Sequence, residues 1–280
     1  MRVTGSELIG LVPKKVLIDA GKHFLKKQER STGIHESEII KIAIKSLGLD
    51  ELAPFDPQER VIEYKLESNS NKPLVNMTLT DFANETASES PAPGGGSIAA
   101  YCGAMGVSLG TMVANLSAHK RGWDERWEEF SNWAEKGMAY QKLLLDLVDE
   151  DTNAFNRIMD AFRLPKDTQA DEAKRQEAIQ VATQYAILTP FKVMEIAYES
   201  MQVMKAMAEF GNPNSVTDAG VGALCARTAV IGAFLNVKIN CGDCDDKDFV
   251  VDILDRGQQL VDDACALEDE IMKITNSKIN

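Results

Sequence analysis

An aspartate interrupts an apolar helical stripe in the middle of the sequence. The stripe recurs at spacings of three and four residues and comprises Leu144, Val148, Asp151, Phe155, Ile158 and Phe162. A carboxylate on a buried seam is costly unless it is hydrogen-bonded or protonated, and its pKa tends to rise toward values suited to proton transfer. Asp151 is therefore a candidate acid–base group, or alternatively a structural carboxylate that caps another helix. The neighbouring Asp149 and Glu150 are predicted to meet solvent or another helix.

A glycine triplet precedes a helix of small apolar residues, in the segment SPAPGGGSIAA. Its prolines are expected to hold the approach extended, and its glycines to permit positive backbone angles and close approach. The first amides of a helix are unpaired and electropositive, so this corner suits a carboxylate or another electron-rich group, unless it is only a turn. It matches neither a Walker A loop nor a dinucleotide fingerprint. The candidate binding residues are Pro93, Gly94, Gly95, Gly96 and Ser97.

A second helix opening, NPNSVTDAGVGAL, repeats this design of turn residues followed by glycines. Thr217 or Asp218 would cap the helix by default. The functional hypothesis is that Asn214 and Asp218 face the glycine corner across one pocket. Later in the same helix, Asn236 and Asn240 lie one turn apart and offer amides to a polar ligand, although Asn240 also suits a C-terminal cap.

Two further motifs have simpler readings. Lys120 and Arg121 follow a predicted helix end, where they would stabilise the helix dipole or pair with an anionic substrate tail. The spacing of Cys241 and Cys244 is that of half a zinc site or of a redox pair. No second ligand pair accompanies it, so the sequence predicts neither a metal site nor disulfide chemistry.

The elements that must position these residues are mainly helical. Residues 1–67 combine two helical stretches with two β-type stretches, RVTGSELIGLV and RVIEYKL, and are predicted to form a small α+β fragment. Residues 68–77 have the composition of a linker, and 78–280 that of a bundle of about six helices. Pro190 is expected to start a new helix or to kink one. The predicted helices are DFANETAS and residues 98–118, 123–164, 171–210, 219–239 and 246–276.

Composition excludes several classes of function. A net charge of -13 disfavours binding to nucleic acid and to anionic lipid. The uncharged segment Ile98–Ala118 is long enough to cross a bilayer but too weakly hydrophobic, so we expect a buried helix and no membrane association. Five irregularly spaced cysteines and an N-terminus without a signal-peptide pattern indicate a cytoplasmic protein.

Taken together, these segments resemble the formiminotetrahydrofolate cyclodeaminase family, which also includes methenyltetrahydrofolate cyclohydrolases. The resemblance runs from Thr78 to the C-terminus through SPAPGGGSIAA, MVANL, VDEDTNAF, RLPKDT, SVTDAGVGAL and GAFLNVKINC. Residues 1–67 look like the tail of a glutamate formiminotransferase, whose catalytic N-terminal subdomain this sequence lacks. Formimino transfer is therefore not expected from this chain alone.

The resemblance implies a substrate, 5-formiminotetrahydrofolate with or without a polyglutamate tail, and two products, 5,10-methenyltetrahydrofolate and ammonia. The suspected acid of the family's Asp-x-Asp-Ala motif corresponds to Asp151, with Thr152 in place of the alanine. By the same resemblance, the glycine corner would hold the pterin or the glutamate tail. Asp218 would face the pterin or assist the proton relay, and Lys120 or Arg121 would meet the tail. The resemblance implies no metal or redox cofactor. It does imply a homodimer or a higher homo-oligomer.

Two other functions stay open at this point. One is a cyclohydrolase that opens methenyltetrahydrofolate with water, in which the same carboxylate would activate the water. The transferase-like stretch favours the cyclodeaminase, since a separate cyclohydrolase has no reason to carry it. The other is a non-catalytic helical assembly module in which the glycines serve packing and Asp151 serves as a cap.

Overall fold

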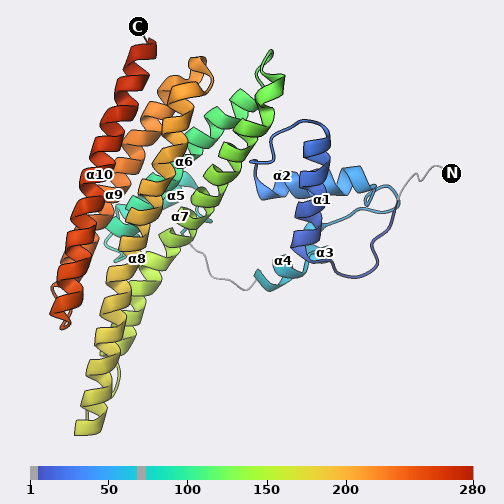
Figure 1. The fold of residues 1–280 in the computed structure, drawn as a ribbon. Coiled ribbons are helices and arrows are strands. Elements are labelled where there is room, and N and C mark those ends of the chain that lie inside the picture. Colours follow the sequence, from blue (N-terminus) through green and yellow to red (C-terminus); the bar gives the residue numbers. More distant parts are fainter. Residues whose placement is uncertain (1–5, 68–73, 280) are drawn as a thin grey trace. The chain divides into compact units, whose positions relative to one another are not determined.

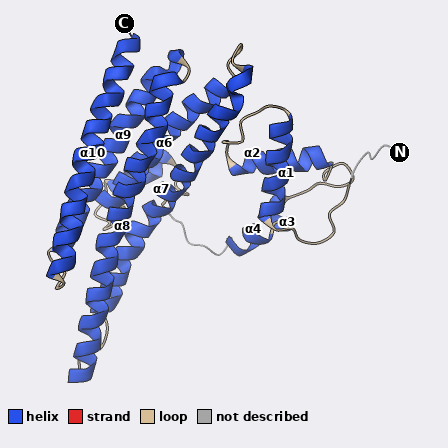
Figure 2. Cartoon of the chain, viewed as in Figure 1, coloured by secondary structure: helices blue, strands red, loops and turns tan. Residues whose placement is uncertain are grey.

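The computed structural model describes residues 6–67 and 74–279, and every regular element in these ranges is a helix (Figure 2). The described residues fall into two compact units. The first comprises residues 6–67 with Ala114–Met138, and the second comprises residues 74–113 with 139–279. The α-helices are α1 (Lys14–Lys27), α2 (Glu36–Leu47), α3 (Pro57–Arg60), α4 (Ile62–Glu67), α5 (Leu79–Thr86), α6 (Gly95–Ala118), α7 (Trp127–Phe162), α8 (Gln169–Phe210), α9 (Val216–Cys241) and α10 (Lys247–Ile279).

The N-terminal fragment is helical, so the predicted α+β architecture is wrong. The stretch RVIEYKL forms the last residue of α3 and most of α4, and its only β-type feature in the described residues is an isolated parallel bridge between Val12 and Val61. Val61 also donates its N–H to Pro57 O, a helical pattern. One bridge cannot extend into a sheet without a second paired strand, and the apolar residues pack against α1 and α2 instead.

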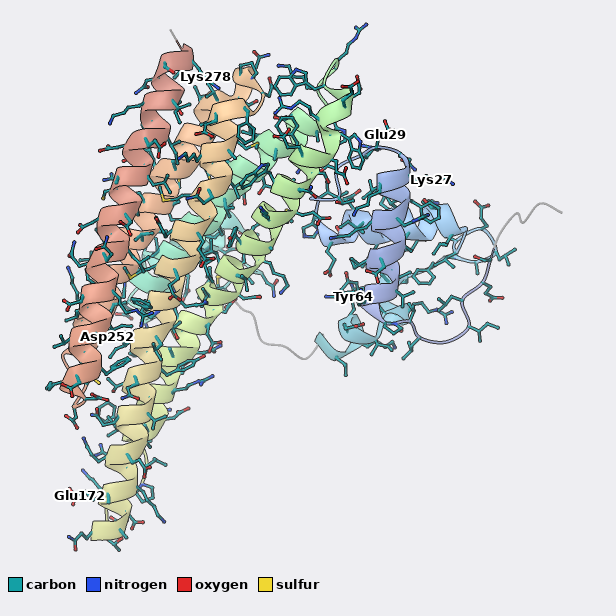
Figure 3. All side chains as sticks on the ribbon, in the orientation of Figure 1. Lys27, Glu29, Tyr64, Glu172, Asp252 and Lys278 are labelled. Carbon is teal, nitrogen blue, oxygen red and sulfur yellow. The ribbon has the colours of Figure 1, made fainter. Side chains whose placement is uncertain are left out.

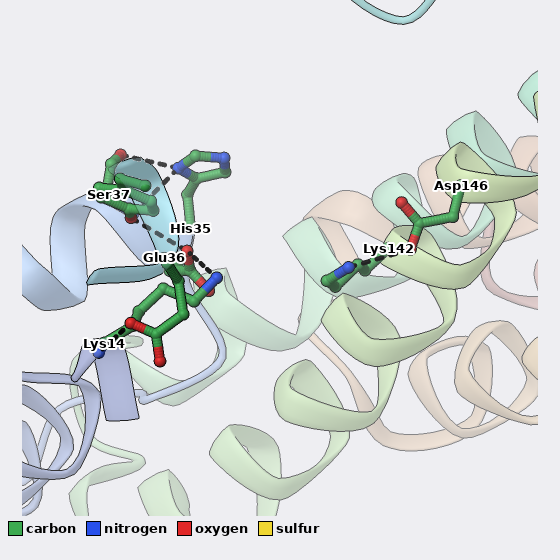
Figure 4. Close-up of polar contacts among 8 residues, drawn as sticks. Lys14, His35, Glu36, Ser37, Lys142 and Asp146 are labelled. Atoms are coloured by element: carbon green, nitrogen blue, oxygen red, sulfur yellow. Dashed lines mark hydrogen bonds and ion pairs between the residues drawn. The ribbon is translucent and has the colours of Figure 1, made fainter. Parts of the chain in front are cut away.

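Helices α1 and α2 build the first unit around a close contact at Gly21, where a Cβ would lie 2.2 Å from the Ile39 carbonyl oxygen. Polar contacts at the start of α2 include the His35 ring, which accepts the Ser37 N–H (Figure 4). The end of α6 and the start of α7 belong to the same unit. There the Asn115 amide donates to Gly33 O at 2.8 Å, and the Ser131 hydroxyl accepts the Thr32 N–H at 2.9 Å.

The second unit is a helical bundle in which α8, α9 and α10 run side by side and alternate in direction (Figure 1). Short connections join them, as is usual for antiparallel neighbours. Acidic side chains such as Glu172 on α8 and Asp252 on α10 are exposed, so negative charge is carried on the surface of the bundle (Figure 3). Six of the α-helices, α5 to α10, fall within residues 78–280, in agreement with the number predicted for that stretch.

Glycines set the packing of α6 against α9. A Cβ on Gly106 would lie 2.7 Å from Gly222 O, and a Cβ on Gly222 would lie 2.7 Å from Gly106 O. Two helix backbones approach this closely only where neither carries a side chain. Gly103 lies beside Ala229 and Gly95 beside Asn236, so numbers rise along α6 as they fall along α9, and the two helices are antiparallel.

The stretches Gly95–Ala118 and Pro213–Cys241 are long and apolar enough to cross a membrane by length and composition alone. In the structure, 61% and 50% of their most apolar windows are buried. Packing inside the protein therefore accounts for much of this apolar composition.

Helix α8 continues through Pro190, where the sequence predicted a new helix or a kink. Proline lacks the N–H that would bond to Ala186 O, four residues earlier. The side-chain amide of Asn240 on α9 donates to that oxygen at 2.7 Å. A tertiary hydrogen bond thus replaces the missing helical one, and this contact defines the role of Asn240.

Candidate active site

Asp151 on α7 faces the first turn of α6. Its Oδ2 accepts the Ser97 N–H at 2.9 Å and lies 3.2 Å from the Ser97 hydroxyl oxygen. The same hydroxyl lies 2.8 Å from Val148 O, one turn earlier on α7. Asp151 and the glycine corner are therefore in contact, and the carboxylate also caps α6, as the structural alternative proposed.

Burial penalises the charged form of the Asp151 carboxylate. Ser97 is fully buried and Asp151 is half-buried. Burial raises the pKa of Asp151 above its ordinary value of 3.8, although the two hydrogen bonds from Ser97 act in the opposite direction. A raised pKa makes the carboxylate a stronger base than an ordinary aspartate, which suits it to take up a proton in general acid–base catalysis.

The three glycines of the corner serve close approach and do not supply positive backbone angles. Among the described glycines, only Gly10, Gly48 and Gly122 have positive φ, so that part of the prediction is wrong. The reason is that α6 already begins at Gly95, where helical angles hold. A Cβ on Gly96 would lie 2.1 Å from Asp151 Oδ1, whereas a Cβ on Gly94 would meet only Pro91 O, at 3.9 Å.

Asn236 also lies at this corner. A Cβ on Gly95 would be 3.2 Å from its Nδ2, which donates to Gly232 O at 2.9 Å. Pro93 is buried just before the triplet, and the Gly94 carbonyl accepts the first helical hydrogen bond, from Ile98 N–H, at 3.1 Å. The structure therefore brings together Asp151, Asn236 and the predicted residues from Pro93 to Ser97.

The two carboxylates before Asp151 have partners that periodicity did not identify. Asp149 is only 5% exposed and accepts the Leu74 and Val75 N–H groups at 2.9 and 3.4 Å. Glu150 accepts a hydrogen bond from the Tyr185 hydroxyl on α8. Asp149, Glu150 and Asp151 thus contact three different segments. The signal in the sequence was the run itself, because three consecutive acids on a helix point in three directions. By contrast, Asp146 and Lys142 form an ordinary exposed ion pair at 2.9 Å (Figure 4).

A groove of about 540 Å³ lies between α7 and α8, and two of its lining residues, Arg157 and Tyr185, contact Glu150. Its polar end is formed by Tyr185 and Arg157, whose guanidinium lies 4.0 Å from the Tyr185 ring centroid and 3.4 Å from Glu150. Its walls include Leu164, Val181 and Leu188. Because consecutive residues on a helix point about 100° apart, Arg157, Asp160 and Ala161 lie on a face of α7 other than that of Asp151.

The second helix opening does not face the first. Asn214 is exposed in the short turn before α9, and Asp218 lies in the first turn of α9. Asn236 is 18 residues further along that helix, a distance of about 27 Å at 1.5 Å per residue. The antiparallel packing of α6 and α9 puts their N-termini at opposite ends of the pair, so the prediction of one shared pocket is wrong for this chain.

Lys120 and Arg121 follow the C-terminal end of α6, and the glycine corner opens its N-terminal end. The 24 residues of this helix span about 36 Å. The Lys120 ammonium lies 4.1 Å from the Trp123 ring centroid, and Arg121 is exposed. Both cations thus follow the end of α6 opposite to its glycine corner.

The described residues contain no group of three or more histidine, cysteine and acidic side chains placed to hold a metal ion. Cys241 and Cys244 are both buried free thiols. Burial raises the pKa of the Cys102 thiol to about 11.

Comparison with known proteins matches residues 78–259 to the family model described as formiminotransferase-cyclodeaminase, and residues 1–67 to the formiminotransferase domain. The chain belongs to the formiminotransferase-cyclodeaminase family. A formimidoyltransferase-cyclodeaminase from Mus musculus is 36% identical over 248 residues, which cover 88% of this chain and 46% of that protein. A methenyltetrahydrofolate cyclohydrolase from Methylorubrum extorquens is 35% identical over 205 residues, covering 73% of this chain and 99% of that protein.

A crystal structure of formiminotetrahydrofolate cyclodeaminase from Thermotoga maritima has the same fold, with a TM-score of 0.65 and 24% sequence identity. The similarity covers 73% of this chain and 98% of that one. The chain spans about half the length of the bifunctional relatives it matches. Membership places the protein among the cyclodeaminase and cyclohydrolase enzymes of folate metabolism.

Proposed function

We propose that this protein is a formimidoyltetrahydrofolate cyclodeaminase, which converts 5-formiminotetrahydrofolate to 5,10-methenyltetrahydrofolate and ammonia. The observation that carries the proposal is the placement of the half-buried Asp151 carboxylate against Gly96 and Ser97, at the N-terminus of α6. Family membership independently implies a folate substrate.

The chemistry divides into two proton transfers. The formimino group enters as an amidinium cation, which an ionised Asp151 attracts. Attack of folate N10 on the amidinium carbon forms the new C–N10 bond, and Asp151 removes the N10 proton. Asp151 then returns the proton to the amino group of the tetrahedral intermediate. The C–N bond to that group breaks, ammonia leaves, and the positive charge stays on the methenyl bridge.

The residues around Asp151 have distinct roles in this scheme. The Ser97 N–H and hydroxyl fix the orientation of the carboxylate, and burial raises its pKa, which makes it a better acceptor for the N10 proton. Gly96 leaves room for the carboxylate beside the backbone. Asn236 offers a polar group at the same corner for the pterin or for the departing nitrogen.

The alternative function is methenyltetrahydrofolate cyclohydrolase. The specific observation in its favour is the similarity to the Methylorubrum extorquens enzyme, of which this chain covers almost the whole length. In that reaction Asp151 would remove a proton from water, which attacks the methenyl carbon.

The two functions differ in substrate and in the direction of the absorbance change. Purified protein is incubated with 5-formiminotetrahydrofolate while methenyl absorbance is followed, and in parallel with methenyltetrahydrofolate while loss of that absorbance is followed. Cyclodeaminase activity predicts rapid formation of the methenyl product with stoichiometric ammonia, abolished in Asp151→Asn and retained in the surface control Asp252→Asn. Enzyme-dependent hydrolysis alone would support the cyclohydrolase, and neither reaction would support the assembly module.

We also propose that the protein forms a homodimer or a higher homo-oligomer. Helices α6 and α9 leave large apolar side chains exposed although their other faces are packed, and a second copy would cover them. These residues are Ile98, Met105, Met112, Val221, Leu235 and Ile239. Light scattering of the purified protein tests this, and a monomer at micromolar concentration would contradict it.

A further inference from the structure

Asp149 is a buried carboxylate that the scheme above does not use. It is 5% exposed, and its two oxygens accept backbone N–H groups from Leu74 and Val75. A buried charge is tolerated only when its hydrogen bonds are satisfied, and two amide donors provide that here. Asp149, two positions before the candidate catalytic acid Asp151, therefore anchors the chain at Leu74.

The anchored segment, residues 74–93, is named the strap. It begins at Leu74, which Asp149 binds. It contains α5 and ends at the buried Pro93, directly before the glycine corner. Both of its ends are thus tied to elements that hold Asp151. Between these ends, none of the eight residues of α5 is buried. Few buried contacts mean a low free energy of local opening, so α5 can lift while the ends stay attached.

Aromatic and apolar side chains line the space under the strap. The Phe82 ring on α5 lies 5.4 Å from the Tyr101 ring on α6, centroid to centroid. Tyr101 is one turn beyond Ser97. A cavity of about 50 Å³ lies beneath, lined by Phe82, Tyr101 and Val148 together with Leu74, Val75, Met77, Leu79 and Leu145. Val148 is also the residue whose carbonyl oxygen lies 2.8 Å from the Ser97 hydroxyl, so the cavity and the Asp151 site share a wall.

We propose that the strap is one wall of the substrate site, that it closes over the flat reduced pterin ring of the folate, and that Asp149 is the positioning residue that holds it. This inference rests on the proposed function for the identity of the ligand. The present cavity is too small for a pterin, so α5 must lift to admit the ring and then settle with Phe82 against it. The two aspartates accordingly have different roles: Asp151 contacts the reacting atoms, and Asp149 acts only by holding the strap.

The test compares Asp149→Asn with the matched control Asp252→Asn, which changes an aspartate to asparagine in an exposed ion pair with Arg256 on α10. Asparagine keeps the shape of the side chain but replaces one of the two accepting oxygens of Asp149 by an amide NH2 group, which donates. We expect the KM for 5-formiminotetrahydrofolate to rise about tenfold in Asp149→Asn, with kcat changed less than about threefold. Hydrogen exchange of residues 74–86 should be faster in this variant without ligand, and wild-type values are expected for Asp252→Asn.

A second measurement follows the strap directly. Folate binding should slow hydrogen exchange of the strap in the wild type and in Asp151→Asn, whose kcat is lost, but much less in Asp149→Asn. If Asp149→Asn fails to fold by circular dichroism, Phe82→Ala serves instead, because Phe82 is only half-buried and its loss should raise KM in the same way.

Wild-type KM and wild-type exchange in Asp149→Asn would overturn the proposal, as would strap exchange that folate leaves unchanged in an active wild type. Failure of the proposed function looks different. In that case the wild type neither turns over nor binds folate, while the faster exchange of Asp149→Asn without ligand would still support the anchor, and its absence would refute it.

Discussion

The openings of α6 and α9 have similar sequences and different surroundings. Each places turn residues and glycines before a helix of small apolar residues. At α6, Asp151 reaches the first turn from α7 and accepts the Ser97 N–H. At α9, the first turn contains its own acid, Asp218, which stabilises the helix dipole from within, and the glycines pack on neighbouring helices. A glycine-rich helix start becomes a candidate active site only when a side chain from another element faces it.

The largest expected difference between the two openings is catalytic. Asp151→Asn should lower kcat by about 10²- to 10⁴-fold, because the amide can neither accept the N10 proton nor return it. Asp218→Asn should leave kcat within about threefold of the wild type, since Asp218 lies about 27 Å along α9 from Asn236, which is the residue of α9 beside the glycine corner. Steady-state assays with both variants check this. Equal losses in the two would mean that the openings share one function.

The next test concerns the glycines of the α6 opening. Gly96→Ala should lower kcat about 10- to 100-fold with a small loss of stability, because the new Cβ would displace the flexible Asp151 carboxylate 2.1 Å away. Gly94→Ala should keep activity and raise the free energy of unfolding by about 0.4 to 1 kcal/mol. Its Cβ would meet only Pro91 O, at 3.9 Å, and the unfolded chain would lose conformational freedom. Activity assays and thermal melts of the pair distinguish these outcomes. Equal effects would show that the triplet acts only as a turn.

The two asparagines at the far end of α9 should separate in the same way. Asn240→Ala is expected to cost about 1 to 3 kcal/mol of unfolding free energy, because Ala186 O would lose the donor that replaces the Pro190 N–H. Asn236→Ala should instead raise KM or lower kcat with a smaller loss of stability, since its amide returns to its own helix at Gly232. Urea unfolding and steady-state kinetics of both variants measure this. A large stability loss in Asn236→Ala alone would reverse the assignment.

The smallest effect expected is on the pH dependence of stability. The pKa of Asp151 is raised in the folded state, chiefly by burial, so between 3.8 and the folded pKa the native protein binds more protons than the unfolded chain. Its stability contribution therefore falls as pH rises through that range. The Tm of Asp151→Asn minus that of the wild type should become more positive as pH rises from 3.8 through the folded pKa of Asp151. A constant difference would mean that the carboxylate is as well solvated in the folded protein as in the unfolded chain.

Much of the bundle could be predicted from the sequence because helix boundaries are local. The predicted stretches 98–118, 171–210 and 219–239 lie within two to three residues of the observed α6, α8 and α9, since apolar periodicity and capping depend on neighbours in the chain. The β-type stretches of the N-terminal fragment failed, because short apolar runs fit a strand and a buried helix equally well until a partner is known.

Residue type and spacing also identified the acid of the candidate site. Asp151 stood out because a charge on an apolar stripe requires a partner, whatever that partner is. The sequence could not say which element supplies it, nor that Asp149 would be the more deeply buried of the two aspartates. Both outcomes depend on segments more than 50 residues away, at Ser97 and Leu74.

What the sequence determined by itself is therefore the helical content of residues 78–280, the presence of a glycine corner, and one carboxylate that had to be satisfied. Only the tertiary structure decided that the corner and the carboxylate meet, that the second opening lies at the other end of the pair, and that Asn240 completes α8 at Pro190. The physical reason is that periodicity and capping act over one or two helical turns. The packing of α6 on α9, by contrast, depends on contacts such as that of Gly106 with Gly222, which are far apart in the chain.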